Sequence, residues 1–337
     1  MNTIYPRNLK KRAATLVKRT PSFQKLVLIH GAISFGVVLA VYAIQVLLNL
    51  VTTNQSGLDG IGTSALFKTA TSTLSVICNL LLPFWEVGIL YAAIRVTRRQ
   101  DTDFSDLTRG FRRWGAVLRF YLLIIVAFIL IFMLLTNALS IVLGILMPFY
   151  LILFPMPDSV SSSMEAFEKQ LMDMANMEDP TAILQMFPKD VLIYVLPMII
   201  LMLLISFVVT FHLYYRIRMS QYLLMDDPAM GAMAAVMISN QMTKGNKWNL
   251  LKLDLSIWWY YLLQFLISSI VWIPDILSFT GISLPLSPNT AFLLFQAITA
   301  IASIGLLWLF GARVQAIYAC AYDVLRTPPQ TITVQND

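Results

Sequence analysis

Charged residues are scarce in this chain of 337 residues, and their scarcity decides its class. They make up 12% of the sequence, whereas a soluble domain carries about 25%. Hydrophobic residues account for 58%, and the mean hydropathy is +0.72. So little polar surface cannot cover a globule in water. The composition therefore excludes a soluble protein and predicts one that is integral to a membrane.

Cysteine and histidine are nearly absent as well. Cys78 and Cys320 are isolated thiols, which form neither a disulfide framework nor a zinc site. With only His30 and His212 beside them, we expect no metal and no cofactor. The chain also lacks the H-E-x-x-H, G-x-S-x-G and P-loop motifs, and no span carries paired carboxylates for acid–base chemistry. We therefore expect a protein that is not an enzyme.

Six apolar stretches are long enough to cross a bilayer as helices, which takes about 20 residues each. The third is too long for one straight span, so it should tilt, break near residues 137–148 or project outward. The prediction is an all-α bundle of six transmembrane helices over residues 26–326, between a basic segment, 1–25, and a polar tail, 327–337. The six spans cover about residues 26–51, 69–96, 117–155, 191–215, 250–273 and 290–312.

Lysine and arginine fall almost entirely on one side of these spans. That side carries 21 of the 24 basic residues, and the other carries only Lys68, Lys169 and Lys189. The positive-inside rule therefore places both termini in the cytoplasm. Topology and anionic lipid headgroups explain the net charge of +6, so no nucleic acid is needed as a partner. The basic residues that we expect at lipid headgroups are Arg112, Arg113, Lys244 and Lys247.

Three segments outside the spans have helical patterns. The acidic outer loop, residues 156–190, predicts a helical hairpin on the outer membrane surface. Two cytoplasmic segments, near residues 101–114 and 226–248, each combine an acidic start with a basic end and a tryptophan, which is typical of interfacial helices. In the second, Asp227 is expected to cap a helix that Pro228 opens, and Gly245 to permit the left-handed turn that ends it.

The stretch from Tyr222 to Trp259 resembles a bacterial integral membrane family known as domain of unknown function 975. The segment around Tyr318 and Tyr322 is similar to the closing segment of that family. The resemblance implies a polytopic protein of a bacterial plasma membrane, and it implies no activity. The residues that match the family's signature are Asp227, Pro228, Ser239, Met242, Gly245, Asn246, Lys247, Trp248, Leu255 and Ser256.

One carboxylate, Glu86, lies well inside a predicted span. A membrane carboxylate is costly and is a functional-site hypothesis by default. A polar stripe accompanies it along one face of the second span, and Pro83 removes a backbone hydrogen bond close by. Glu86 either handles a ligand or a proton, or it is protonated and hydrogen-bonded to a neighbouring helix. The stripe consists of Ser72, Ser75, Asn79, Pro83 and Glu86.

Amides recur in the outer halves of other spans, at Asn137, Gln264 and Gln296 among others. If they face inward, they line a polar vestibule that opens outward beneath the acidic hairpin. Local pairing of each amide across helices fits the sequence equally well.

Three functions are compatible with these features. The leading hypothesis is binding or translocation of an amphiphilic partner, a lipid or a hydrophobic peptide, through a polar intramembrane cavity near Glu86. The first alternative is an accessory or assembly protein that contacts another membrane protein through its spans and outer hairpin. The second is a proton- or ion-coupled carrier that uses Glu86.

Overall fold

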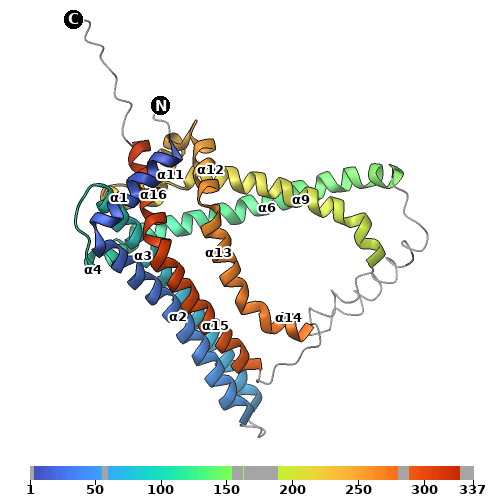
Figure 1. Cartoon of the computed structure of the whole chain (residues 1–337). Helices are drawn as coiled ribbons and strands as arrows, with labels where there is room; N and C mark the ends of the chain where they lie inside the picture. Colours follow the sequence, from blue (N-terminus) through green and yellow to red (C-terminus); the bar gives the residue numbers. More distant parts are fainter. Residues whose placement is uncertain (1–3, 55–59, 154–161, 163–188, 280–287, 327–337) are drawn as a thin grey trace, which may run out of the picture. The chain divides into compact units, whose positions relative to one another are not determined.

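The structure is a computed structural model of the chain, and it describes residues 4–54, 60–153, 162, 189–279 and 288–326 (Figure 1). Within these ranges every regular element is a helix. The chain divides into two compact units, which are described separately. Unit 1 comprises Met1–Tyr121 and Tyr215–Asp337, and unit 2 comprises Leu122–Tyr214.

Most helices belong to unit 1. Two long helices, α6 (Trp114–Leu153) and α9 (Lys189–Ile217), have one end in unit 1 and run mostly through unit 2. The others are α1 (Pro6–Arg19), α2 (Pro21–Asn54), α3 (Gly60–Thr97), α4 (Phe104–Leu107), α5 (Arg109–Arg112), α10 (Ser220–Asp226), α11 (Ala232–Thr243), α12 (Lys247–Ser256), α13 (Trp258–Ser269), α14 (Ile273–Phe279), α15 (Pro288–Leu306) and α16 (Ala312–Arg326).

Five of these helical stretches are long and apolar enough to cross a membrane, and six if a bent pair counts as one span. The prediction of a helical protein with several candidate membrane spans is thereby confirmed. The bent pair is α12 and α13, which meet at 60° around Ile257, where one straight span was expected. The last apolar stretch runs on through a π-helical turn, Leu307–Gly311, into α16, instead of ending near residue 312.

Helix α6 is unbroken over 40 residues, so of the three alternatives for this stretch the break near residues 137–148 does not occur. At 1.5 Å per residue it is about 60 Å long, twice the roughly 30 Å of a bilayer's hydrocarbon core. The helix continues through Pro148. Because a membrane offers no water to satisfy a broken backbone, continuing the helix costs less than interrupting it. The excess length must tilt or project.

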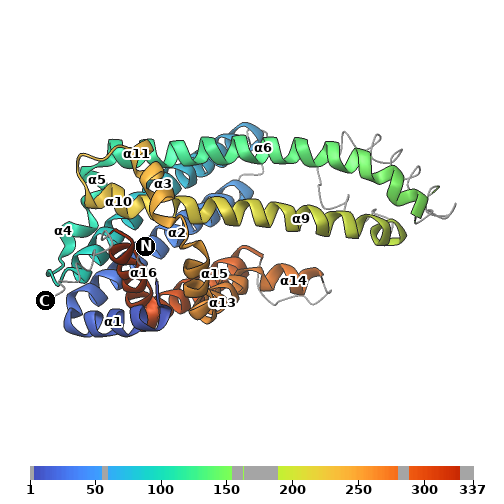
Figure 2. The same cartoon turned by 90° about the horizontal axis from the view of Figure 1, so that it is seen from above.

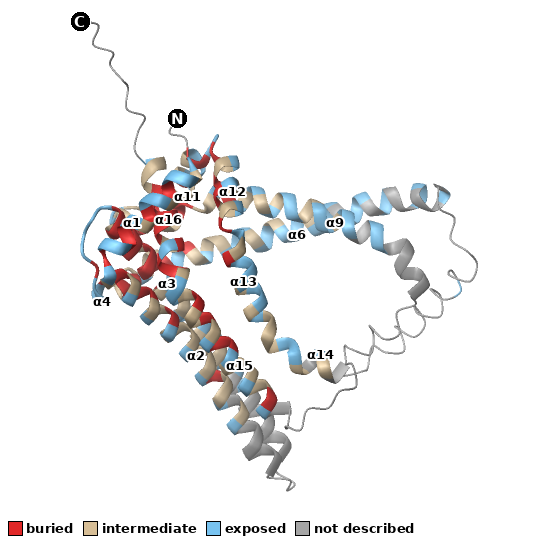
Figure 3. Cartoon of the chain, in the orientation of Figure 1, coloured by how far each residue is buried: buried red, intermediate tan, exposed pale blue. Residues whose placement is uncertain are grey.

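The core of unit 1 lies at one end of α3 (Figure 3). There α3 packs against α1, α4, α5, α10 and α16. Helices α2, α3 and α15 run side by side away from it (Figures 1 and 2). Two glycines permit the closest approach. An ideal Cβ on Gly88 would lie 2.0 Å from the carbonyl oxygen of Leu107, and one on Gly110 would lie 2.0 Å from that of Phe84. Backbone therefore packs directly on backbone between α3 and the α4–α5 segment.

The two predicted cytoplasmic segments are helical in part. The first contains the single turns α4 and α5, and the second contains α11. Helix α11 begins at Ala232 and not at Pro228, so the expected cap is wrong: the Oδ1 atom of Asp227 instead accepts a hydrogen bond from the amide of Ala229, at 2.9 Å, within a turn. The predicted outer hairpin and the polar tail lie outside the described residues.

Candidate functional site

Glu86 lies on an exposed face of α3, inside a candidate span. The hydroxyl of Tyr121, near the start of α6, donates to its Oε2 atom at 3.5 Å. The side-chain amide of Gln221, on α10, donates to that same hydroxyl at 3.1 Å. A contact of 3.5 Å is at the limit of a hydrogen bond, so Tyr121 holds the carboxyl group only loosely.

The rest of the polar stripe is satisfied largely within α3. The side-chain amide of Asn79 donates to the carbonyl oxygen of Ser75 at 2.9 Å and to its hydroxyl at 3.4 Å. Ser72 is exposed on the same face. Pro83 has no N–H group, so the backbone carbonyl of Asn79 lacks its usual helical donor. The stripe is therefore rich in hydrogen-bond acceptors near Glu86.

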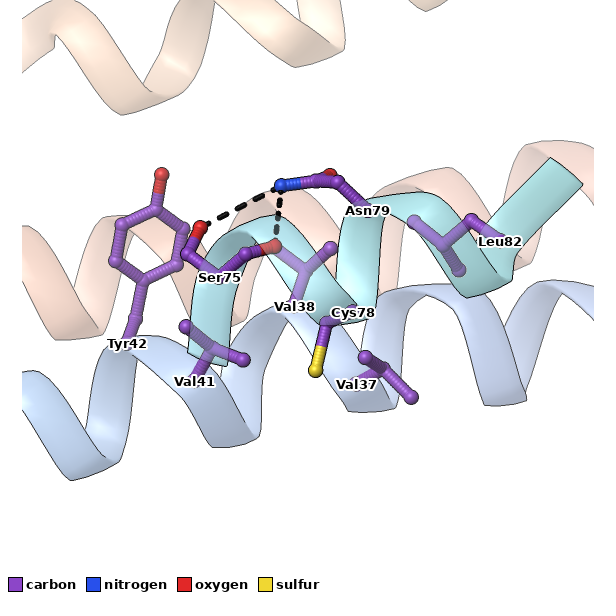
Figure 4. A pocket seen from close by; sticks show the side chains of 8 residues that line it. All are labelled: Val37, Val38, Val41, Tyr42, Ser75, Cys78, Asn79 and Leu82. Atoms are coloured by element: carbon purple, nitrogen blue, oxygen red, sulfur yellow. Dashed lines mark hydrogen bonds between the residues drawn. The ribbon is translucent and has the colours of Figure 1, made fainter. Parts of the chain in front are cut away.

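A small pocket lies between α2 and α3 beside this stripe (Figure 4). Its volume of about 70 Å³ is far below the ~300–1,000 Å³ of typical ligand pockets. Glu86 does not line it, so a cavity at Glu86 itself stays a prediction. The lining is mostly apolar and consists of Val37, Val38, Val41, Tyr42, Ser75, Cys78, Asn79 and Leu82.

The three other amides predicted to line a vestibule have different settings. Asn137 belongs to unit 2, where its exposed side chain donates to the carbonyl of Met133 in the same helix, at 2.8 Å. Gln264 on α13 and Gln296 on α15 are half-buried in unit 1. Asn137 thus pairs within its own helix, whereas the alternative interpretation expected pairing across helices, and a shared vestibule stays a prediction.

Of the four basic residues expected at headgroups, Arg113 is engaged inside the protein. Its guanidinium donates to the carbonyls of Pro228 at 2.7 Å, of Asp227 at 3.2 Å and of Leu224. Partial burial, together with the charge of Arg109, lowers the pKa of Arg113, which remains a cation.

The other three basic residues differ in exposure. Arg112 and Lys244 are exposed, and Lys247 is half-buried at the start of α12.

Two acidic residues that sequence reasoning did not single out organise the same end of unit 1. The first is Asp226, whose side chain is only 3% exposed. It accepts two hydrogen bonds from Arg98, at 2.5 and 2.7 Å, and one from the hydroxyl of Tyr322, at 2.8 Å. Arg326 forms a further ion pair with it. Asp226 thus links the ends of α3, α10 and α16.

The second is Asp254 on α12. It accepts hydrogen bonds from Arg218, Tyr215 and, at 2.6 Å, the hydroxyl of Tyr318. Tyr318 and Tyr322 are one helical turn apart on α16, so one face of this helix binds both carboxylates. The one-turn spacing of the two tyrosines is visible in the sequence and places both on one helix face. The sequence does not show which acidic residues they bind.

Ser239, one of the residues that match the family's signature, has a structural role. It is fully buried, accepts a hydrogen bond from the amide of Met219 at 3.1 Å and donates to the carbonyl of Arg216 at 2.8 Å. It therefore satisfies backbone groups where α9 ends and α10 begins. Gly245, with φ of 81°, forms the left-handed turn expected before α12.

The family model described as protein of unknown function (DUF975) matches residues 10–326. The chain belongs to this family. No curated protein and no solved structure matches the chain. The match covers the helical region from residue 10 onward, so the resemblance read from the signature segment is confirmed.

Proposed function

We propose that this family member is a non-enzymatic protein of a bacterial plasma membrane, with both termini cytoplasmic, that binds an amphiphilic partner on the polar face of α3 and can pass it across the membrane. The observation that carries the proposal is the exposure of Glu86 in an apolar span, with Tyr121 as a weak hydrogen-bond partner. A carboxyl group facing hydrocarbon is costly unless another polar group covers it. A bound headgroup meets that need.

The polar face of α3 offers hydrogen-bond acceptors, and these determine which kind of partner it can bind. The Glu86 carboxylate can accept hydrogen bonds, and so can the backbone carbonyl of Asn79, which lacks its usual helical donor because residue 83 is proline. The side-chain amide of Asn79 is already engaged with Ser75. The complementary group is a cationic donor, such as the primary amine of a lipid headgroup or of a peptide.

The order of groups along α3 fits an amphiphile. Glu86 lies seven residues, about 10 Å of helix, from Asn79 in the direction of the polar end of unit 1. The mostly apolar pocket beside Asn79 lies deeper in the span. A headgroup at Glu86 would therefore leave its first methylene groups against the pocket. The pocket can take only a short part of a chain.

The test is lipid and peptide mass spectrometry of protein purified in membrane-derived nanodiscs. Glu86→Gln should lose a co-purifying amphiphile while its thermal unfolding is unchanged. Ser140→Ala, which removes an exposed hydroxyl bonded within α6, is the matched control and should keep it. Full retention of the same amphiphile by Glu86→Gln would overturn the proposal. Uptake into proteoliposomes that depends on pH, and is lost in Glu86→Gln, would favour the proton-coupled carrier.

A second candidate, an accessory protein that contacts another membrane protein, has its own observation. Beyond the length that a bilayer core requires, α6 carries a row of exposed apolar side chains on one face: Ile141, Ile145, Phe149 and Ile152. This role predicts that Phe149→Ser loses a co-purifying membrane protein and that Glu86→Gln does not. The opposite pattern favours amphiphile binding.

A further inference from the structure

The amphipathic helix α1 uses its apolar face inside the protein. Leu9, Ala13, Leu16 and Val17 are each at most 7% exposed, and α1 packs mainly against α16 (Figure 1). Lys10 adds a separate contact with α12 by donating to the carbonyl of Ser256. An interfacial helix normally inserts its apolar face into a bilayer. Here that face is occupied, and only the polar face is available to a partner.

The charged residues on the available face are all basic. Residues 6–19 include no acidic residue. At 100° per residue, Arg7, Lys11 and Lys18 fall within a 40° arc, and Arg19 lies on the same exposed side. All four side chains are exposed. Arg12 points toward Asp323 on α16, 3.9 Å away, and so belongs partly to the internal contacts.

The position of α1 places this face at the edge of the membrane. Thr20, with φ of −122° and ψ of 75°, is the one residue between α1 and the candidate span that begins at Pro21. Lys18, Arg19 and Lys25 therefore lie within about one turn of the span's start, at the depth of headgroups. Tyr5, at 62% exposure just before α1, is an aromatic side chain of the kind that is enriched at this depth.

We propose that the exposed row formed by Arg7, Lys11, Lys18 and Arg19 is a docking surface for anionic phospholipid headgroups of the membrane that the first span enters. The row extends from Arg7 to Arg19, about 18 Å of helix, so it meets several headgroups at once. Binding is electrostatic, because α1 has no apolar face left to insert. The surface is separate from the polar face of α3, and the proposal does not depend on a role for Glu86.

The experiment uses the full-length protein in mixed micelles. Native mass spectrometry counts bound phosphatidylglycerol against phosphatidylcholine at low and high salt. The test variant carries Arg7→Gln, Lys11→Gln, Lys18→Gln and Arg19→Gln. The matched control carries Arg7→Lys, Lys11→Arg, Lys18→Arg and Arg19→Lys, which preserves every charge.

Each basic residue near an anionic surface contributes roughly five-fold in affinity. The glutamine variant should therefore lose at least about tenfold of the preference for phosphatidylglycerol, and the control should keep it. The wild-type preference should fall at high salt. Equal preference in the wild-type protein and the glutamine variant overturns the proposal, as does displacement of phosphatidylglycerol by a short RNA or an acidic peptide at equal charge concentration. If the fourfold variant unfolds, the pair Lys11→Gln and Lys18→Gln gives the same comparison.

Discussion

The end of unit 1 where α3 packs and the helices of unit 2 both contain long apolar stretches, but they differ in how much of these is buried. In the candidate span on α3, 44% of the most apolar window is buried, whereas none of it is in the span on α6. The α3 end packs through glycine contacts, buried carboxylates and tyrosine hydroxyls, while α6 exposes its apolar side chains. In lipid there is little hydrophobic gain from bringing helices together. Close backbone contact and polar bonds therefore decide which part of this chain is packed.

The largest effect on stability should come from adding a side-chain atom where the backbones of α3 and α4 touch in unit 1. Gly88→Ala places a Cβ atom 2.0 Å from the carbonyl of Leu107, and no side chain can move aside to relieve the clash. We expect a loss of about 3 kcal/mol or more in the free energy of unfolding, seen as early thermal unfolding in detergent. Gly36→Ala on α2, which meets nothing within 4 Å, is the control and should unfold like the wild-type protein. Equal unfolding of the two variants would contradict the packing.

A smaller but clear effect should follow from neutralising a buried carboxylate. Asp226→Asn removes the counter-ion that Arg98 and Arg326 share, and leaves Arg98 with the longer ion pair to Asp323, at 3.8 Å. Because both guanidinium groups are partly exposed, we expect about 2 kcal/mol of destabilisation, less than the full cost of breaking a buried pair. Chemical unfolding of purified protein measures it. Asp227→Asn, one residue away, keeps an oxygen for Ala229 and should change stability little. If both substitutions cost the same, Asp226 is not the link between α3, α10 and α16.

Removing the hydroxyl of Ser239 should cost less again. Ser239→Ala leaves the amide of Met219 and the carbonyl of Arg216 without this partner, at about 1–2 kcal/mol. Hydrogen exchange should rise first at residues 216–220, and exchange in α2 should stay at its wild-type rate. A rise spread evenly over unit 1 would contradict a local role.

The smallest effect is expected in unit 2. Asn137→Leu removes an amide that bonds only to the carbonyl of Met133 among the contacts described, on an exposed face. Thermal unfolding should shift by less than the equivalent of about 0.5 kcal/mol. A large loss of stability would show that Asn137 faces a packed interior and would support the predicted vestibule.

Much of the architecture could be predicted from the sequence, because it depends on local properties. Apolar length and the scarcity of charge predict the spans, and Gly245 predicts the left-handed turn before α12. The bend at Ile257 could not be predicted, because residues 250–273 contain no proline or glycine that would mark it.

The candidate site was predictable only in part. Glu86 and its stripe follow from helical spacing within one segment. Tyr121 and Gln221, which complete the chain of hydrogen bonds, come from 35 and more residues away. The partners of Asp226 and Asp254 are equally distant in sequence, and no local pattern pairs them.

The central claim is that Glu86 receives a cationic headgroup that donates hydrogen bonds, and a lipid titration followed by thermal unfolding tests it most directly. A ligand that binds the folded protein raises its stability in proportion to affinity. Phosphatidylethanolamine, whose ammonium group donates N–H bonds, should stabilise the wild-type protein more than phosphatidylcholine, whose ammonium group has none. Glu86→Gln should unfold at the wild-type temperature without lipid and should lose the difference between the two lipids. Equal stabilisation by both lipids in the wild-type protein, or an unchanged difference in Glu86→Gln, would contradict the claim.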